Sequence, residues 1–114
     1  MARTTADVRP VAFRTAARRD LRDIARYIAR ESGSRATAEA FVGRLIGHCF
    51  RLARLEATAG RIRADIGPEY RSTPFGRYVI IFRYDGSTFL VVAILSAYRD
   101  LRPVVVRRND RDPE

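Results

Sequence analysis

Residues 70–101 read YRSTPFGRYVIIFRYDGSTFLVVAILSAYRDL and decide the fold of the chain. Three apolar segments separated by turn residues lie in this stretch, and each predicts a β-strand. The segment Arg77 to Tyr84 alternates strictly, so its even-numbered residues should form one apolar face of a sheet. That face would carry Tyr78, Ile80, Phe82 and Tyr84. The stretch therefore predicts a small antiparallel sheet with arginines at its margins.

The last strand and its hairpin give more detail. Phe89 to Leu95 is apolar throughout, which is typical of an interior strand covered on both faces. Asp85-Gly86 is a strong signal for a two-residue hairpin turn, which would pair Phe82 with Phe89 and Ile80 with Val91. Pro74-Phe75-Gly76 predicts the preceding turn.

Two apolar stripes with helical spacing precede these strands. Thr15 is the predicted N-cap of the first helix, and Gly33 its left-handed end. Ser34 is the predicted N-cap of the second helix, which should run to about Leu55. Because the break is so short, the helices should form an antiparallel hairpin that packs on the sheet. The stripes are Ala17, Leu21, Ile24, Ala25 and Ile28, then Ala38, Phe41, Val42, Leu45, Cys49, Leu52 and Ala53.

The predicted order is therefore β-α-α-β-β-β, an α+β domain with a helical hairpin on one face of a small antiparallel sheet. A short strand at residues 11–14 opens the domain, and residues 56–68 form a loop. The other sheet face is expected to be partly exposed and to bear arginine side chains. Residues 1–101 form the single domain, and residues 102–114 form a tail in which 103–106 could add a short strand before a frayed end.

Composition narrows the class of function. The 114 residues carry a net charge of +9, and all 22 basic residues are arginine. Such an excess predicts attraction to nucleic acid, to the ribosome or to an acidic protein. There is no apolar run of membrane-spanning length and no signal-peptide core, so we expect a cytoplasmic protein without a membrane partner.

The cysteine and the histidine predict no special chemistry. Cys49 is the only cysteine, so no intramolecular disulfide can form, and it is expected to fill space in the core. His48 is its neighbour in a helical pattern, and adjacent helical positions do not provide the spacing that a metal-chelating pair needs. We therefore expect no metal ion and no other cofactor.

Four segments together resemble the ParE/RelE superfamily, the toxins of type II toxin–antitoxin pairs. They are RDLRDIARYIA at 19–29, GRIR at 60–63, RSTPFGRYVIIFR at 71–83 and ILSAYRDL at 94–101. The resemblance covers about residues 8–101 and implies the RelE/ParE-like fold. It also implies a cognate, ParD-like antitoxin whose acidic or amphipathic C-terminal segment packs on the helical hairpin and the sheet. ParE-branch toxins act on DNA gyrase, whereas RelE-branch toxins cut mRNA on the ribosome, and a shared fold does not choose between them.

The chemistry of RNA cleavage favours the ParE branch. Cleavage through the 2′-hydroxyl needs a base, an acid and cations that stabilise the phosphorane. The chain is rich in cations but poor in bases, since it has no lysine and since His48 is expected on the second helix, away from the predicted sheet. Ser96 stands where many relatives carry a histidine. We therefore expect a gyrase inhibitor that acts by binding and has no catalytic residues.

Two alternatives remain open at this point. A RelE-like, ribosome-dependent endoribonuclease would use Arg71, Arg77, Arg83 and Tyr98 at its phosphate site. A non-toxic relative would only bind an antitoxin-like partner.

The predicted interface residues follow from the same segments. Contacts to the target or partner are expected from Arg71, Arg77, Arg83, Tyr98 and Arg99, and contacts to the antitoxin from Arg22, Arg26 and Arg30. Each has a structural alternative. Arg71 and Arg77 could flank a strand turn and pair with Glu69 or Asp65, and Arg83 could be a solvated strand residue. The segment 98–100 could only cap the sheet. The helical arginines could form a solvated face.

Overall fold

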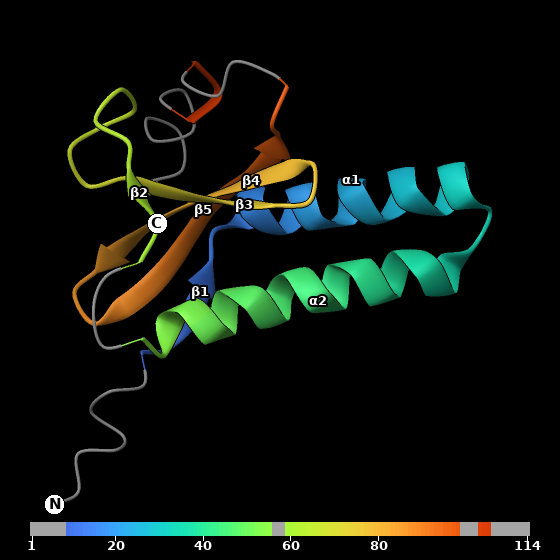
Figure 1. Ribbon diagram of the computed structural model, residues 1–114, viewed down its shortest axis with the longest axis horizontal. Coiled ribbons are helices and arrows are strands. Elements are labelled where there is room, and N and C mark those ends of the chain that lie inside the picture. Colours follow the sequence, from blue (N-terminus) through green and yellow to red (C-terminus); the bar gives the residue numbers. More distant parts are fainter. Residues whose placement is uncertain (1–8, 56–58, 99–102, 106–114) are drawn as a thin grey trace, which may run out of the picture.

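The computed structural model describes residues 9–55, 59–98 and 103–105. A hairpin of two helices packs on one face of a five-stranded sheet (Figure 1). The helices are α1 (Thr15–Ser32) and α2 (Arg35–Ala53). The strands are β1 (Val11–Phe13), β2 (Arg61–Ile62), β3 (Arg71–Phe75), β4 (Tyr78–Asp85) and β5 (Thr88–Ser96). This arrangement confirms the predicted α+β fold with its helical hairpin.

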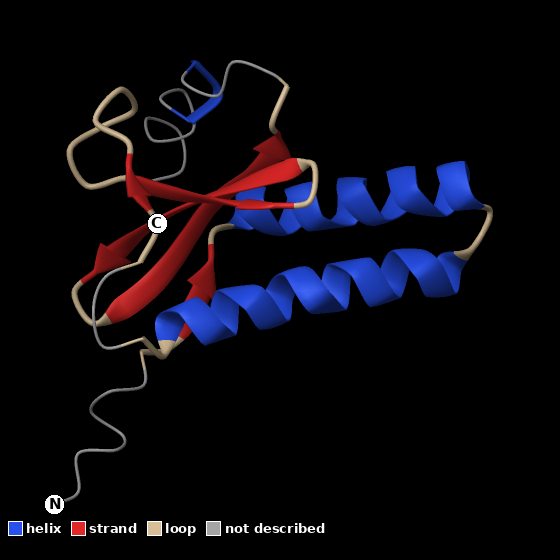
Figure 2. Cartoon of the chain, viewed as in Figure 1, coloured by secondary structure: helices blue, strands red, loops and turns tan. Residues whose placement is uncertain are grey.

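The sheet has the order β1-β5-β4-β3-β2, which Figure 2 shows with the strands in red. β1 is parallel to β5, and the other neighbours are antiparallel. Every residue from Phe89 to Leu95 is buried, so the predicted interior strand is confirmed. β1 begins directly after Pro10, whose carbonyl accepts a hydrogen bond from the backbone N–H of Phe89.

The register of the β4–β5 hairpin differs from the prediction. Asp85 pairs with Thr88, so the two-residue loop is Gly86-Ser87, and Phe82 faces Val91 instead of Phe89. Gly86 has a φ of 65°, and no non-glycine residue in the described part of the chain has a positive φ. A positive φ at the first loop position alone matches a type II′ turn, whereas the expected type I′ turn needs it at both positions.

A bulge in β5 follows from the next pairs along the hairpin. Phe82 faces Val91 and Ile81 faces Ala93, which leaves Val92 as an extra residue. The extra residue turns Ile94 back to the helical face of the sheet, where it joins the main core. The shifted turn moves the partner of Ile80 from the predicted Val91 to Ala93, and the bulge moves it one residue further to Ile94.

The segment before β4 contains more β-strand than the sequence predicted. Residues 61–62, expected in a loop, form the edge strand β2 against β3. β3 continues through Pro74 and Phe75, so the turn is Gly76-Arg77. Proline fits in this strand because β2 pairs only with Arg71 and Ser72, which leaves the outer edge of β3 without a strand neighbour at Pro74.

The end of α1 and the start of α2 agree with the prediction, whereas the start of α1 and the end of α2 differ slightly. Arg14, not Thr15, is the N-cap, because its extended backbone continues β1 and donates its N–H to the carbonyl of Val91. Gly33 ends α1 with a φ of 71°, as predicted. The hydroxyl of Ser34 caps α2 by accepting the N–H of Thr37 at 3.0 Å, also as predicted. α2 ends at Ala53, slightly earlier than expected.

The second face of the sheet is covered, although the sequence suggested partial exposure. Ile66 and Tyr70 from the 63–70 loop and Val105 pack there against Ile81 and Leu90. Residues 103–105 are helical, so they do not form the extra strand that was considered. Val105 is fully buried and packs against the second face of the sheet, whereas an added strand would lie at the sheet edge. The rest of the predicted tail, 102 and 106–114, lies outside the described residues.

Within the described ranges, no helix combines the length and the apolar character needed to cross a bilayer.

Candidate functional site

The structure divides the predicted arginines between the two ends of the sheet. Arg71 shares the helical face with Phe82, its partner across the strands, and donates a hydrogen bond to the carbonyl of Ala59 at 3.3 Å. Arg83 lies on the opposite face and forms an ion pair with Glu69, 3.2 Å between Nη1 and Oε1. The Arg83 side chain is only 16% exposed, so the alternative of a solvated strand residue is wrong. Both guanidinium groups therefore have partners within the chain.

Arg77 directly precedes β4. It lies six positions before Arg83, which corresponds to about 20 Å along an extended strand. Its guanidinium carbon lies 5.8 Å from the centre of the Tyr98 ring. Tyr98 is 80% exposed, and its backbone N–H donates to the hydroxyl of Ser96 at 3.2 Å. The structure thus brings Arg77 together with Tyr98 and Ser96, but not with Arg71 or Arg83.

The backbone holds this segment in place. The N–H of Ala97 donates to the carbonyl of Arg77 at 2.9 Å, one step beyond the pairing of Tyr78 with Ser96. Arg99, another predicted contact, lies outside the described residues.

A groove runs from Arg77 along α1. Its outer part is a pocket of about 270 Å³ lined by Tyr27, Arg77, Tyr78 and Ser96. A second hollow of about 200 Å³ shares all of these residues except Arg77 and continues over Asp20, Asp23, Ile24, Ile94 and Leu95. We call the two together the α1 groove.

The sequence did not identify the tyrosines of the α1 groove as site residues. Tyr27 lay within a recognised helical segment and Tyr78 on a predicted core face, and neither was given a role. The available signal was spacing: Asp20, Asp23, Ile24 and Tyr27 lie at i, i+3, i+4 and i+7 and so share one helix face. Burial raises the pKa of Tyr78, the nearby Tyr27 adds to the rise, and Arg77 opposes it. Tyr78 therefore stays protonated at neutral pH and is no base.

Asp20 supports the floor of the α1 groove. Its carboxylate is buried and accepts a hydrogen bond from the backbone N–H of Ile94 at 2.9 Å. Ile94 follows the bulge in β5, so this bond ties α1 to the strand where its register changes. The sequence signal was again the helical spacing, which puts Asp20 between Ala17 and Ile24 on the buried stripe.

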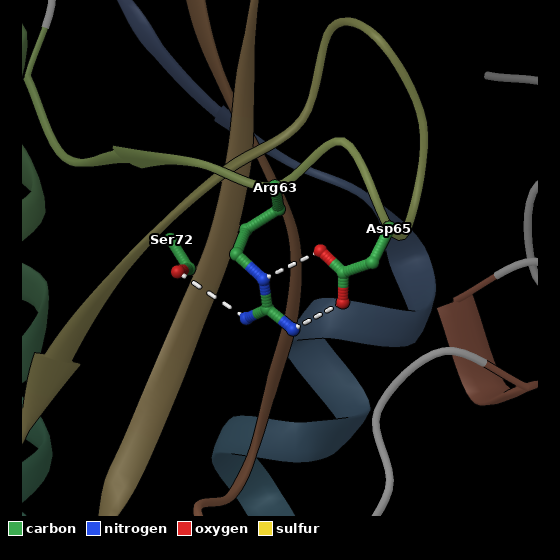
Figure 3. A network of polar contacts seen from close by, with 3 residues as sticks. All are labelled: Arg63, Asp65 and Ser72. Atoms are coloured by element: carbon green, nitrogen blue, oxygen red, sulfur yellow. Dashed lines mark hydrogen bonds and ion pairs between the residues drawn. The ribbon is translucent and has the colours of Figure 1, made fainter.

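A polar network closes the opposite end of the sheet. Arg63 donates from Nε and Nη2 to the two carboxylate oxygens of Asp65, at 2.9 and 2.7 Å, and from Nη1 to the Ser72 hydroxyl at 3.4 Å (Figure 3). Asp65 had been considered as a partner of Arg71 or Arg77, and its bidentate partner is instead Arg63. The hydrogen bonds to Asp65 raise the pKa of the Arg63 guanidinium, which stays charged. The network holds the 63–70 loop against the second sheet face.

Comparisons with known proteins agree with this architecture. The family described as "ParE toxin of type II toxin-antitoxin system, parDE" matches residues 11–101. The chain belongs to the ParE toxin family. Its structure is similar to a chain of the chromosomal ParDE toxin–antitoxin system from P. aeruginosa, with a TM-score of 0.70 at 18% sequence identity. The match covers 79% of this chain and 97% of that one, and it confirms the RelE/ParE-like fold. No curated protein sequence matches the chain significantly.

The arginines predicted to contact an antitoxin lie on the surface of this ParE family member. Arg22, Arg26 and Arg30 are all exposed on α1. Arg26 forms an ion pair of 3.1 Å with Asp23, and both side chains are about two-thirds exposed, at 66% and 70%. Because Asp23 lines the α1 groove, this pair places Arg26 at the groove's rim. The contact role of the three arginines stays a prediction.

Neither His48 nor Cys49 is among the described residues that line the α1 groove. The prediction that His48 lies away from the sheet is wrong, because α2 packs on the sheet and brings the ring onto Phe75 of β3. The His48 ring packs 5.3 Å from that of Phe75, and its Nδ1 lies 3.4 Å from Nη2 of Arg51. Burial lowers the pKa of His48, and Arg51 lowers it further. Burial raises the pKa of Cys49 to about 12, so its thiol stays protonated. In the part of the chain that the structure describes, no group of three histidine, cysteine or acidic residues is arranged to hold a metal ion.

Proposed function

We propose that this ParE family toxin inhibits DNA gyrase by direct binding and that a cognate antitoxin neutralises it. The family match over residues 11–101 carries the proposal, because inhibition of gyrase is what the ParE branch implies. We also propose that the toxin acts in the cytoplasm.

The geometry around Arg77 supports binding over RNA cleavage. A ribonuclease site needs a base and an acid beside its cations. Among the described residues, those that line the pocket with Arg77 are two tyrosines and a serine. The raised pKa of Tyr78 makes it a poor base, and His48 packs on Phe75 instead of lining the groove.

Arg77 and Tyr98 are the proposed contacts to the target. Tyrosine and arginine are both enriched at the energetic centres of protein interfaces. Arg71 and Arg83, also predicted contacts, have partners within the chain, so we restrict the proposed contact to the two residues that face solvent together.

The antitoxin is proposed to be a ParD-like protein with an acidic, amphipathic C-terminal segment. The net charge of +9 favours such a partner, and Arg22, Arg26 and Arg30 offer exposed cations on α1. A segment that folds on binding can follow the surface of the helical hairpin closely.

The test is a supercoiling assay with purified gyrase, ATP and relaxed plasmid. We expect loss of supercoiling, or trapped cleaved DNA, when the folded toxin is added. Adding the antitoxin first should leave the supercoiling activity of gyrase intact. Full gyrase activity at a large excess of folded protein would contradict the proposal. Cleaved mRNA on translating ribosomes would then identify a RelE-like activity instead.

A further inference from the structure

We propose that a row of arginines on α1 binds the phosphate backbone of duplex DNA without reading its sequence. The row begins in the first turn of α1 and continues at every fourth residue: Arg18, Arg22, Arg26 and Arg30. We call these four residues the arginine row. The inference goes beyond the inhibition of gyrase and does not depend on it.

The arginine row covers the solvent face of α1. All of its members are exposed, whereas Ala17 and Ile24 on the opposite face of the helix are buried in the core. Side chains four residues apart lie one above the other on a helix, so each arginine follows the last after about 6 Å along the helix axis. The row therefore forms a continuous cationic surface about 18 Å long.

The guanidinium groups of the arginine row are free to bind a ligand. Arg22 and Arg30 form no hydrogen bond or ion pair with the residues that the structure describes. Arg26 is paired with Asp23, but the two side chains are 66% and 70% exposed. Such exposed pairs contribute little, so a phosphate can replace this carboxylate easily. Arg18 fixes the start of the row, since its Nη1 donates to the carbonyl of Phe13 at 2.9 Å.

The arginine row is unfavourable for α1 itself. Like charges at i and i+4 repel one another and destabilise a helix. Cations near a helix N-terminus also oppose the macrodipole, and the first turn of α1 has no acidic residue to compensate. The stability of α1 therefore does not explain the row. Features that break a local rule of stability are expected where a chain binds something.

The packing of α1 argues against a membrane surface as the ligand. An interfacial helix must insert its apolar face into the lipid. In this protein that face is already occupied, because Ile24 is buried in the core and Leu21 and Ile28 pack against it. The arginine row is therefore suited to a polyanion that approaches from solvent.

The regular spacing of the row favours a DNA duplex over an acidic protein. Phosphates recur about every 3.4 Å along the axis for each strand of a duplex, so a surface of about 18 Å faces about five of them per strand. The carboxylates of a protein have no such fixed repeat. A regular row of cations therefore matches a duplex backbone better than it matches an acidic protein.

The side chains within the row favour a duplex over a single strand. Proteins that bind single strands combine cations with aromatic side chains on which the bases stack. The residues between the arginines of the row are 19–21, 23–25 and 27–29, and the only aromatic residue among them is Tyr27, which lines the α1 groove. A ligand whose bases stay stacked with one another fits this surface.

DNA binding by the row has two consequences. Where the target is gyrase, the row could bind the DNA that the enzyme holds, which would add affinity to the contact made by Arg77 and Tyr98. This consequence rests on the proposed function, whereas DNA binding by the row does not. Because three arginines of the row are also predicted to contact the antitoxin, DNA and antitoxin should compete for them.

The test measures binding of the full chain to a fluorescently labelled DNA duplex of arbitrary sequence, by anisotropy at several salt concentrations. The row variant is Arg22→Gln/Arg30→Gln. The charge-matched control is Arg44→Gln/Arg61→Gln, which removes one exposed arginine from α2 and one from β2, the edge strand opposite β1. Thermal unfolding shows that each variant is folded. The row variant should melt no lower than the wild type, because it removes repulsion between like charges.

The salt dependence gives the expected result. The logarithm of the association constant falls with the logarithm of the salt concentration by about 0.9 for each phosphate neutralised, so the row variant should reduce this slope by about 1.8. Its affinity at low salt should fall at least about tenfold. The control should change the slope by less than about 0.5. Arg22→Lys/Arg30→Lys should keep the wild-type slope, because lysine also binds phosphates.

Four outcomes would overturn the inference, and none of them bears on the inhibition of gyrase. They are a wild-type chain that does not bind the duplex at low salt, and equal slopes for the row variant and the control. The third is stronger row-dependent binding of poly(U) than of the duplex, which would assign the row to single-stranded RNA. The fourth is row-dependent binding of polyglutamate with DNA binding that ignores the row, which would assign it to an acidic protein.

Discussion

Arginine plays different parts at the two ends of this sheet. At the closed end, defined by Arg63, Arg71, Arg83 and the 59–70 segment, the guanidinium groups of these three arginines bind carboxylates, a hydroxyl and a carbonyl of the same chain. At the open end, defined by Arg77, Tyr98 and the α1 groove, the guanidinium lies against an exposed aromatic ring. Burial follows the same division, since the Arg63 and Arg83 side chains are 17% and 16% exposed whereas Arg77 is exposed.

The difference separates two kinds of arginine in a basic protein, those that bind groups of their own chain and those that are available to a partner. One that is half-buried and bound within the chain positions a loop, and its removal leaves unpaired groups behind. One that faces solvent beside an aromatic ring and a pocket is available to a partner. The closed end should therefore control stability, and the open end should control binding.

The largest effect is expected at Gly60, where the closed end approaches the sheet. Gly60 has a φ of 80°, and a Cβ there would lie 2.7 Å from the Phe82 ring and 2.9 Å from the carbonyl oxygen of Ser72. Gly60→Ala should lower the free energy of unfolding by about 3 kcal/mol, which combines backbone strain with overpacking. Urea denaturation measures it.

Gly33→Ala is the control for this prediction. Gly33 has a φ of 71°, but nothing lies within 4 Å of its Cβ position. It should cost only the backbone strain, about 1 kcal/mol. Equal losses for the two variants would show that the closed end is not tightly packed at Gly60.

A smaller effect is expected at Arg63. Arg63→Ala removes the bidentate pair with Asp65 and the bond to Ser72, and should lower the free energy of unfolding by about 1 kcal/mol. The value is modest because Asp65 is 42% exposed and solvent screens the pair. Arg26→Ala, which removes an exposed pair with Asp23, should change stability by no more than about 0.5 kcal/mol. If Arg26→Ala costs as much as Arg63→Ala, the distinction between the ends fails.

The smallest effect is a pH dependence from His48. Burial and Arg51 lower the pKa of His48 in the folded state below its usual 6.5, so the unfolded chain binds this proton more readily. Stability from His48 is therefore fully present above pH 6.5 and falls as the pH drops toward the lowered folded-state pKa.

The measurement is the free energy of unfolding between pH 5.5 and 7.5, for the wild type and for His48→Leu. The wild-type curve should fall more steeply toward low pH than the variant's curve. Parallel curves would show that His48 has an ordinary pKa in the folded protein.

Local features of the fold could be predicted from the sequence. The alternation in residues 77–84 identified both faces of β4, and the unbroken apolar run identified β5 as interior. Gly33 and Ser34 were identified as helix ends because their conformations and hydrogen bonds are local. These features depend on nearest neighbours along the chain, which a sequence displays directly.

The strand register and the long-range contacts could not be predicted in the same way. The hairpin register depends on the φ angle of a residue in the turn, and the bulge at Val92 depends on how β5 packs on both faces. The covering of the second face by Val105 is a contact between distant segments. The candidate site shows the same limit. The sequence pointed to arginines whose contact role stays a prediction, and their partners and the α1 groove arise only once helix and sheet are packed together.

The central claim is that the open end binds the target while the closed end holds the fold. It is tested most directly by gyrase supercoiling assays with wild-type toxin, Arg77→Ala and Arg83→Ala, each at the same concentration of folded protein. We predict that Arg77→Ala loses most of the inhibition at an unchanged melting temperature, whereas Arg83→Ala inhibits like the wild type and melts at a lower temperature. Inhibition by Arg77→Ala that equals the wild type, with inhibition lost in folded Arg83→Ala, would contradict the claim.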